Sequence, residues 1–132
     1  MADITEDRIT AERCIKRLGD PLADGAVIPA GAMYCLDDEG KAVPASTNTG
    51  GPVRGIALRR ADATAGHTHV EGAIGVYLFQ NSETDPILPA HVGKKNAKVQ
   101  DCHTVNLGGT VSAGKVIELT DEGVFVQLGE KW

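Results

Sequence analysis

The same short phrase occurs twice in this chain and points to a fold built from tight hairpins. The stretch AGAMYCLDDEGKAV begins at Ala30, the stretch AGKVIELTDEGVFV begins at Ala113, and the two match at Ala-Gly, Leu, Asp-Glu-Gly and Val. In each, two short apolar runs flank an acidic turn that ends in a glycine, Gly40 or Gly123, which can adopt positive φ. Apolar runs joined by such a turn are typical of β-hairpins. The sequence therefore predicts two hairpins of similar design.

The pattern within the second hairpin indicates a half-buried strand. Val124, Val126 and Leu128 would share one face of this strand, with Phe125 and Gln127 on the other. The Ala-Gly pair ahead of each hairpin would let the chain turn sharply into its first strand. Nothing else in the chain keeps the same offset, so we interpret the two phrases as similar solutions to one local problem rather than as an internal duplication.

The rest of the chain also favours short strands. Further strands are expected in VRGIALRRADA, centred on Ile56 and Leu58, in HTHVEGAIGVYLFQ, with a bulge near Gly72 or Gly75, and in KNAKVQDCHTV. NSETDPILPAHVG, with its two prolines, is expected to be irregular or at most one helical turn. A content of 16 glycines and 4% aromatic residues suits strands joined by tight turns. These features predict an all-β fold, a small sandwich or barrel-like domain of short strands and hairpins.

The N-terminal stretch TAERCIKRLGD fits more than one structure. Ala11, Ile15 and Leu18 would lie on one face of a helix. A short helix that cannot bury its apolar face is only marginally stable, and the same residues also fit an extended arm or an edge strand. We favour the arm. The expected organisation is therefore an N-terminal arm at residues 1–20 and a β-rich domain at residues 21–132.

Composition excludes several classes of function. A length of 132 residues suits one domain, and a net charge of −5 without a basic block argues against a nucleic-acid-binding surface. No apolar run approaches the length of a membrane span, and the first residues do not resemble a secretion signal. Cys14, Cys35 and Cys102 are an odd number without close spacing, so we expect reduced thiols in a protein made in the cytosol.

One motif has the appearance of a metal site. In His67-Thr68-His69, a strand would direct both imidazoles to the same side, and Glu71 would extend the row. Cupins use this kind of His-x-His in a β-barrel. However, Glu71 comes earlier than the cupin glutamate does, and no histidine follows Leu107. We therefore expect no metal ion, and a small cupin-like metal-dependent enzyme using His67 and His69 is the alternative hypothesis.

No other stretch assembles a catalytic group. Cys102 and His103 are adjacent, so a strand would direct them to opposite faces rather than toward each other. No serine lies in a Gly-x-Ser-x-Gly turn, and GGPVRG lacks the Lys-Ser/Thr ending of a phosphate-binding loop. The sequence thus predicts a protein that is not an enzyme, with no catalytic residues and no cofactor.

The order of several modest motifs resembles a known family. The motifs are GAVIPAGAMYCLDDEGKAVPAS, VRGIA, GVYLFQNSETDPILPAHVGKKNAKVQD and SAGKVIELTDEGVFVQL. In this order and spacing, from about Asp20 to Leu128, the chain resembles the capsid decoration (cement) proteins of tailed bacteriophages, particularly those of Mu-like phages.

The resemblance implies a structural virion protein without enzymatic activity. Such a protein is made in the bacterial cytoplasm, binds the outside of the assembled phage head and clips neighbouring major capsid protein subunits together. Self-association as a homotrimer is expected, with a homodimer as the next choice, and neither nucleic acid nor membrane is an expected partner. A phage tail or connector component is a further alternative.

Capsid attachment is expected to use the arm and the last residue. An extended arm can add a strand to an exposed sheet edge of another protein. The residues expected to contact the capsid are Ile4, Arg8, Ile9, Arg13, Ile15, Arg17, Leu18 and Trp132.

Overall fold

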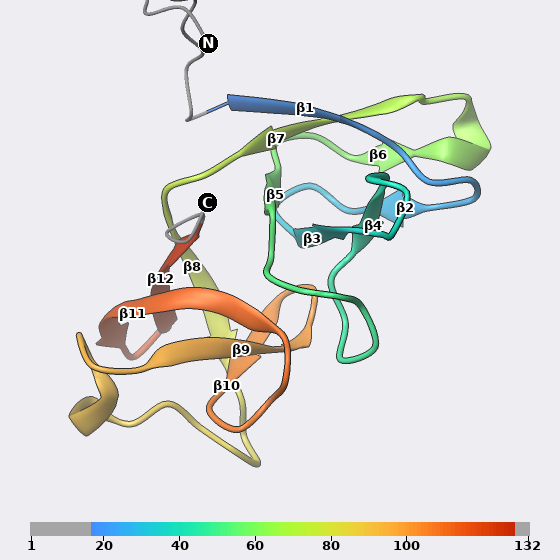
Figure 1. Cartoon of the computed structure of the whole chain (residues 1–132). Helices are drawn as coiled ribbons and strands as arrows, with labels where there is room; N and C mark the ends of the chain where they lie inside the picture. The colour runs from blue at the N-terminus through green and yellow to red at the C-terminus, as the bar shows by residue number, and fades with distance from the viewer. Residues whose placement is uncertain (1–16, 129–132) are drawn as a thin grey trace, which may run out of the picture.

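Figure 1 shows the computed structural model, which describes residues 17–128. The protein folds into an antiparallel sheet and a closed barrel that share one hydrophobic core, with a short two-stranded sheet beside them. The first half of the chain forms β1 (Arg17–Pro21), β2 (Val27–Ile28), β3 (Met33–Leu36), β4 (Ala42–Pro44), β5 (Gly55–Ala57), β6 (Ala61–Asp62) and β7 (His69–Ala73). The second half forms β8 (Val76–Asn81), β9 (Asn96–Asp101), β10 (Thr104–Asn106), β11 (Ser112–Thr120) and β12 (Gly123–Leu128). The predicted all-β class is confirmed.

Helical structure within this part of the chain is minimal. Two 3-10 turns occur, η1 (Ala63–Ala65) and η2 (Pro89–His91), and η2 begins at the second proline of the stretch expected to be irregular or at most one helical turn. Among residues 17–128, no helix has the length and apolar character needed to cross a membrane.

The first sheet has the strand order β1-β7-β5-β3-β4 and is antiparallel throughout. Its two edges approach each other just after β1. There Leu22 donates its N–H to the Thr68 carbonyl beside β7 and also forms a parallel bridge with Ala42 of β4. The sheet is therefore rolled, and the short pair β2–β6 lies beside it.

The second sheet is a closed five-stranded barrel with the order β10-β8-β12-β11-β9. The β9–β10 pairing closes it, and β8 and β10 run parallel. In β12, Val124, Val126 and Leu128 are buried, whereas Phe125 and Gln127 are partly exposed, so the predicted alternation is confirmed.

One hydrophobic core joins the two sheets. Val116 and Val126 of the barrel belong to the same buried cluster as Met33, Cys35 and Ile56 of the first sheet. A smaller cluster around Ile28, Tyr34, Ala57 and Val70 fills the rolled first sheet. The shared cluster makes residues 17–128 one packed unit.

Both predicted hairpins are present. β3 pairs with β4 and β11 pairs with β12, with positive φ at Gly40 (79°) and Gly123 (148°). Similar side-chain bonds hold the turns: the Asp37 carboxylate accepts the N–H of Glu39 at 2.9 Å, and the Thr120 hydroxyl accepts that of Glu122 at 3.2 Å. The Ala-Gly pairs differ, because the first lies in a turn before β3 whereas the second lies inside β11.

Two stretches expected to be single strands are each divided. HTHVEGAIGVYLFQ forms β7 and β8, which belong to different sheets, and the chain crosses between the sheets at Ile74–Gly75. KNAKVQDCHTV forms β9 and β10, joined by a turn in which the Asp101 carboxylate accepts the N–H of His103 at 2.9 Å. Cys102 and His103 therefore lie in that turn rather than on opposite faces of a strand.

Candidate interaction surface

Strand β1 connects the described structure to the segment expected to bind a partner. Of the expected contact residues, Arg17 and Leu18 lie in β1, while Ile4, Arg8, Ile9, Arg13, Ile15 and Trp132 lie outside the described residues. β1 is an edge strand of the first sheet, so the helical alternative is wrong for Arg17 and Leu18. The boundary expected after residue 20 falls inside this strand.

The outer edge of β1 is open at its N-terminal end. In the antiparallel register with β7, hydrogen-bonded and non-hydrogen-bonded pairs alternate, and Leu22 with Thr68 is a hydrogen-bonded pair. Pro21 is therefore at a position whose backbone faces away from β7, and its missing N–H costs no ladder bond. By the same alternation, the peptide groups of Arg17 and Gly19 face outward, where no described strand pairs with them.

A buried polar network fixes β1 in the sheet. The Tyr34 hydroxyl on β3 donates to the Asp20 carboxylate at 2.7 Å, and the Arg54 guanidinium contacts both oxygens of that carboxylate at 3.2 Å. Tyr34 is fully buried and Asp20 is 6% exposed. Charge-assisted bonds to a buried carboxylate are strong, and their loss leaves buried polar groups without partners. The chain therefore has a defined anchor three residues after Arg17.

The network depends on a glycine of the neighbouring strand. The Tyr34 hydroxyl occupies the space that a side chain at Gly72 of β7 would need, because a Cβ there would overlap the hydroxyl oxygen. Gly72 and Leu18 are paired across β7 and β1. The glycine that the sequence analysis associated with a bulge therefore makes room for a tyrosine instead.

The stability of the protein should fall in alkaline solution partly because of Tyr34. Burial raises the pKa of its hydroxyl, and both the hydrogen bond to Asp20 and the carboxylate charge act in the same direction, whereas Arg54 opposes them. The unfolded chain releases this proton near pH 10 but the folded chain keeps it, so Tyr34 stabilises the fold below about pH 10 and ever less above it.

We therefore expect Tyr34→Phe to lower the free energy of unfolding by about 1 kcal/mol at pH 8. The difference in free energy of unfolding between this variant and the wild type should become smaller as the pH rises from about 10 to about 11.5. Urea unfolding of both proteins across this range measures it. Because Cys35 and Cys102 also have raised pKa values, the difference between the two proteins is the relevant quantity. A difference that stays constant with pH would contradict the expectation.

The outer face of the barrel carries an apolar strip formed by Val76, Leu78, Ile117 and Phe125. Leu78 of β8 and Phe125 of β12 are direct cross-strand partners, and Val76 shares the face of Leu78. Ile117 protrudes where the register of β11 with β12 shifts between Val116 and Glu118. Val76 is 47% exposed, and Leu78 and Ile117 are each 39% exposed.

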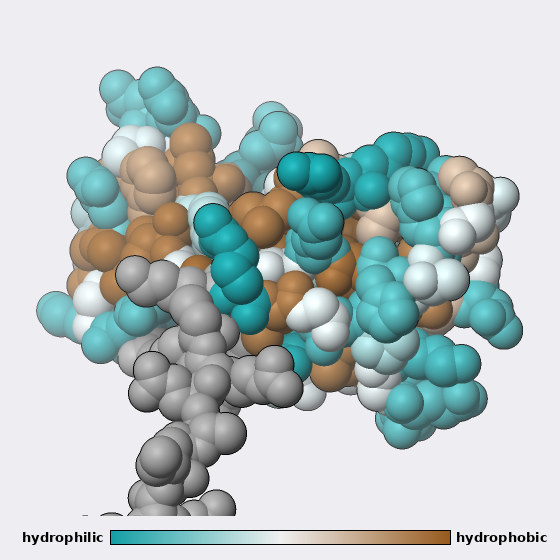
Figure 2. Space-filling view, turned by 90° about the horizontal axis from the view of Figure 1, so that it is seen from above, coloured by the Kyte–Doolittle hydropathy of each residue, from teal (hydrophilic) through white to brown (hydrophobic). Residues whose placement is uncertain are grey.

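Figure 2 shows apolar atoms gathered at the left of the view, on the side where Figure 1 places the barrel strands β8, β11 and β12. Exposed apolar side chains gathered on one side of a molecule in this way are typical of a surface that another protein covers.

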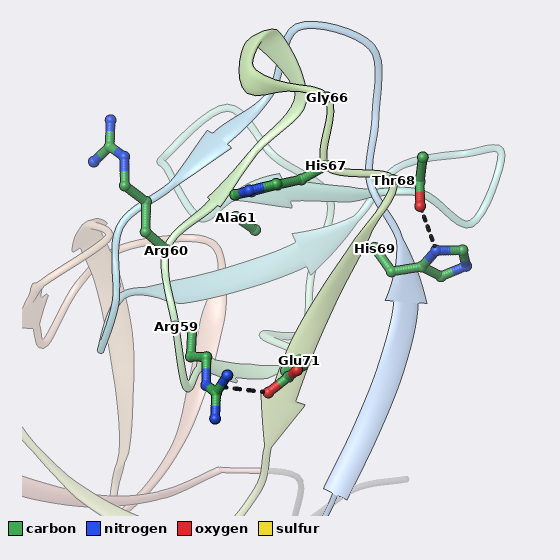
Figure 3. Close-up of a pocket in the computed structure, with 8 residues that line it drawn as sticks. All are labelled: Arg59, Arg60, Ala61, Gly66, His67, Thr68, His69 and Glu71. Atoms are coloured by element: carbon green, nitrogen blue, oxygen red, sulfur yellow. Dashed lines mark hydrogen bonds and ion pairs between the residues drawn. The ribbon is translucent and has the colours of Figure 1, made fainter.

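The two candidate metal ligands lie at an open hollow of about 400 Å³ but do not converge. His67 precedes β7, and its Nδ1 accepts the N–H of Asp62 at 2.9 Å, so its ring turns toward β6. His69 begins β7, and its Nδ1 lies 3.0 Å from the Thr68 hydroxyl. Figure 3 shows the two rings pointing to opposite sides of the chain between them. The sequence expectation of both imidazoles on one side of a strand is wrong because His67 lies outside the strand.

The carboxylates near the hollow are engaged elsewhere. Glu71 forms an exposed ion pair with Arg59 at 3.6 Å, as Figure 3 shows. The Asp62 side chain accepts the N–H of Thr64 at 2.9 Å and so caps η1, and its hydrogen bonds to Thr64 hold the pKa of that carboxyl below its usual value. Within residues 17–128, no three His, Cys, Asp or Glu side chains are arranged to bind one metal ion.

The described thiols are not activated. Cys35 is buried and free, and its burial raises the pKa of the thiol. Cys102 is also free, and burial together with the Asp101 carboxylate raises its pKa. A thiol with a raised pKa is mostly protonated near neutral pH, which makes it a poor nucleophile.

Sequence reasoning missed the apolar strip and the polar network. The run Val76-Tyr77-Leu78-Phe79 is apolar on both faces, and this pattern could have indicated an apolar outer surface. The network joins Asp20 to Tyr34, which lies 14 residues later in the chain, and to Arg54, which lies 34 residues later. No local sequence pattern connects these positions. The chain matches no protein-family model, no curated protein and no solved structure.

Proposed function

We propose that this protein is a capsid decoration protein that binds the outer surface of a phage head and stabilises contacts between major capsid protein subunits. The observation that carries the proposal is the apolar strip on the outer face of the barrel, where Leu78 and Phe125 form a cross-strand pair. Contact of apolar side chains with water is unfavourable. A partner that covers the strip therefore gains a binding free energy of about 25 cal/mol for each Å² of apolar surface buried. The order and spacing of sequence motifs in which the chain resembles decoration proteins support this class of partner.

The open end of β1 suggests a second attachment point. β1 begins at Arg17, where its outer edge has no neighbour among residues 17–128. A partner strand can pair with such an edge through main-chain hydrogen bonds. Two attachment points on one molecule reinforce each other, because the second binds at a high effective concentration once the first is bound.

Co-sedimentation with phage heads tests the proposal. The purified protein is mixed with heads of its own phage before and after expansion, and the bound protein is quantified against the major capsid protein. We expect saturable binding at a fixed ratio, mainly to expanded heads. Absence of binding to both forms would contradict the proposal.

Two variants test the attachment points in the same assay. Deletion of residues 2–16 keeps all of β1 and should abolish binding while the domain stays folded. Leu78→Gln should weaken binding about tenfold, since the remaining exposed part of a leucine contributes about 1.5 kcal/mol when it is buried. Leu58→Gln is the matched control, because Leu58 is 38% exposed, close to the 39% of Leu78, and lies outside the strip. Equal binding by both variants would exclude the strip as a contact.

A further inference from the structure

Two hollows of opposite charge lie on the barrel. The first, here called the lysine hollow, has a volume of about 460 Å³ and is lined by Lys94, Lys95, Asn96, Lys98 and Leu107. The second, here called the acidic hollow, has a volume of about 450 Å³ and carries the side chains of Glu83, Asp121 and Glu122. The two are similar in size and carry equal numbers of opposite charges.

The charges in both hollows are unpaired within the described part of the chain. The ion pairs found among residues 17–128 join Lys41 to Glu39, Arg54 to Asp20, Arg59 to Glu71 and Arg60 to Asp62, and none of them involves either hollow. Lys94 and Lys95 are exposed, as are Asp121 and Glu122. In a chain with a net charge of −5, three unpaired lysines in one hollow are a local concentration of positive charge.

No ion pair joins the two hollows among residues 17–128. The lysine hollow lies at the start of β9 and near the end of β10, whereas the acidic hollow lies at the end of β8 and at the β11–β12 turn. In the closed barrel, β10 lies between β9 and β8, and β11 lies between β12 and β9, so the two hollows are lined by residues of different strands.

We propose that the lysine hollow of one copy binds the acidic hollow of a second copy of this chain. Two different surfaces then meet, so the contact is heterologous, and repeated contacts of this kind form a ring where the rotation between copies closes. Charge complementarity favours this partner, because the chain itself supplies a surface with three acidic side chains opposite in charge to the three lysines. The proposal gives a contact surface to the self-association expected for the proposed function, but its test needs no phage head, so the two can fail separately.

Sedimentation velocity of the full-length protein at two salt concentrations is the first test. At about 0.05 M salt we expect concentration-dependent association. At about 1 M salt the Debye length falls to about 3 Å, and the dissociation constant should rise at least about tenfold. A protein that is monomeric at low salt, or that associates equally at both salt concentrations, would overturn the proposal.

Charge exchange makes the test specific. The first variant carries K94E, K95E and K98E, and the second carries E83K, D121K and E122K. Circular dichroism first shows that each variant is folded. Each variant should then be monomeric at low salt, because its two hollows carry charges of the same sign. An equimolar mixture should associate again, since the unchanged acidic hollow of the first variant fits the unchanged lysine hollow of the second.

A control variant carries D24K, D38K and E39K, which changes the net charge as much as the second variant does but at exposed positions outside both hollows. It should associate as the wild type does at low salt. Folded variants that associate individually, or whose mixture stays monomeric, would show that the hollows do not bind each other.

Discussion

Gly114→Ala is expected to lower the free energy of unfolding by at least about 3 kcal/mol, the largest effect of any single substitution considered for this fold. Gly114 lies inside β11 at φ 153° and pairs with Leu128 of β12. A Cβ at this position would overlap the carbonyl oxygen of Gln127. Both partners in the clash are backbone, and β12 is held on its other side by β8. The barrel therefore cannot relieve the overlap without breaking strand pairs.

Urea unfolding followed by circular dichroism measures this effect, and Gly19→Ala is the control. Gly19 also lies in a strand, but its φ is not positive and a Cβ there would meet no atom within 4 Å. The control should change stability by less than about 1 kcal/mol. Similar stabilities for the two variants would show that the barrel tolerates a displaced β12.

Asp20→Ala is expected to lower the free energy of unfolding by about 2–3 kcal/mol. The substitution leaves the buried Tyr34 hydroxyl without its acceptor and removes the carboxylate that Arg54 contacts. This loss is at or below the lower limit of about 3 kcal/mol for breaking a buried ion pair, because the Arg54 side chain is 32% exposed and water can solvate it. Hydrogen exchange at the Leu22 amide, which bonds to β7 beyond Asp20, should also become faster.

A double substitution separates the network from a general loss of packing. In a Tyr34→Phe background, Asp20→Ala should cost less than it does in the wild type, because phenylalanine has no hydroxyl that needs an acceptor. Asp24→Ala is the control, since Asp24 is exposed and lies close by in sequence. Additive losses for Asp20 and Tyr34 in thermal or urea unfolding would contradict a coupled network.

The sequence predicted the hairpins because their signals are local. Asp37, Gly40, Thr120 and Gly123 act within a few residues of their own positions, so turn chemistry is sufficient to place them. The division of HTHVEGAIGVYLFQ between two sheets was not predicted, because the apolar run does not show which strands its parts will join. Strand partners depend on residues far away in the chain, and β-propensity carries no information about them.

The candidate site was predictable to a smaller extent. The sequence placed His67 and His69 on one strand face, but the hydrogen bonds between His67 and Asp62 hold His67 outside β7. Exposure of Val76 and Leu78 follows from barrel closure, which decides which face of β8 turns inward. Which face of β8 is buried depends on all five barrel strands, so the periodicity of the β8 sequence alone cannot predict it.

The two sheets are built from successive parts of the chain, and this order has a consequence for synthesis on the ribosome. The first sheet uses strands within residues 17–73, and the barrel uses strands within residues 76–128. Met33 and Ile56 reach their shared core only when Val116 and Val126 arrive. A nascent chain that has emerged only as far as the end of β7 would thus expose apolar side chains to solvent, where they are open to aggregation and to chaperones. The interval between the two halves is the period in which this protein most needs protection.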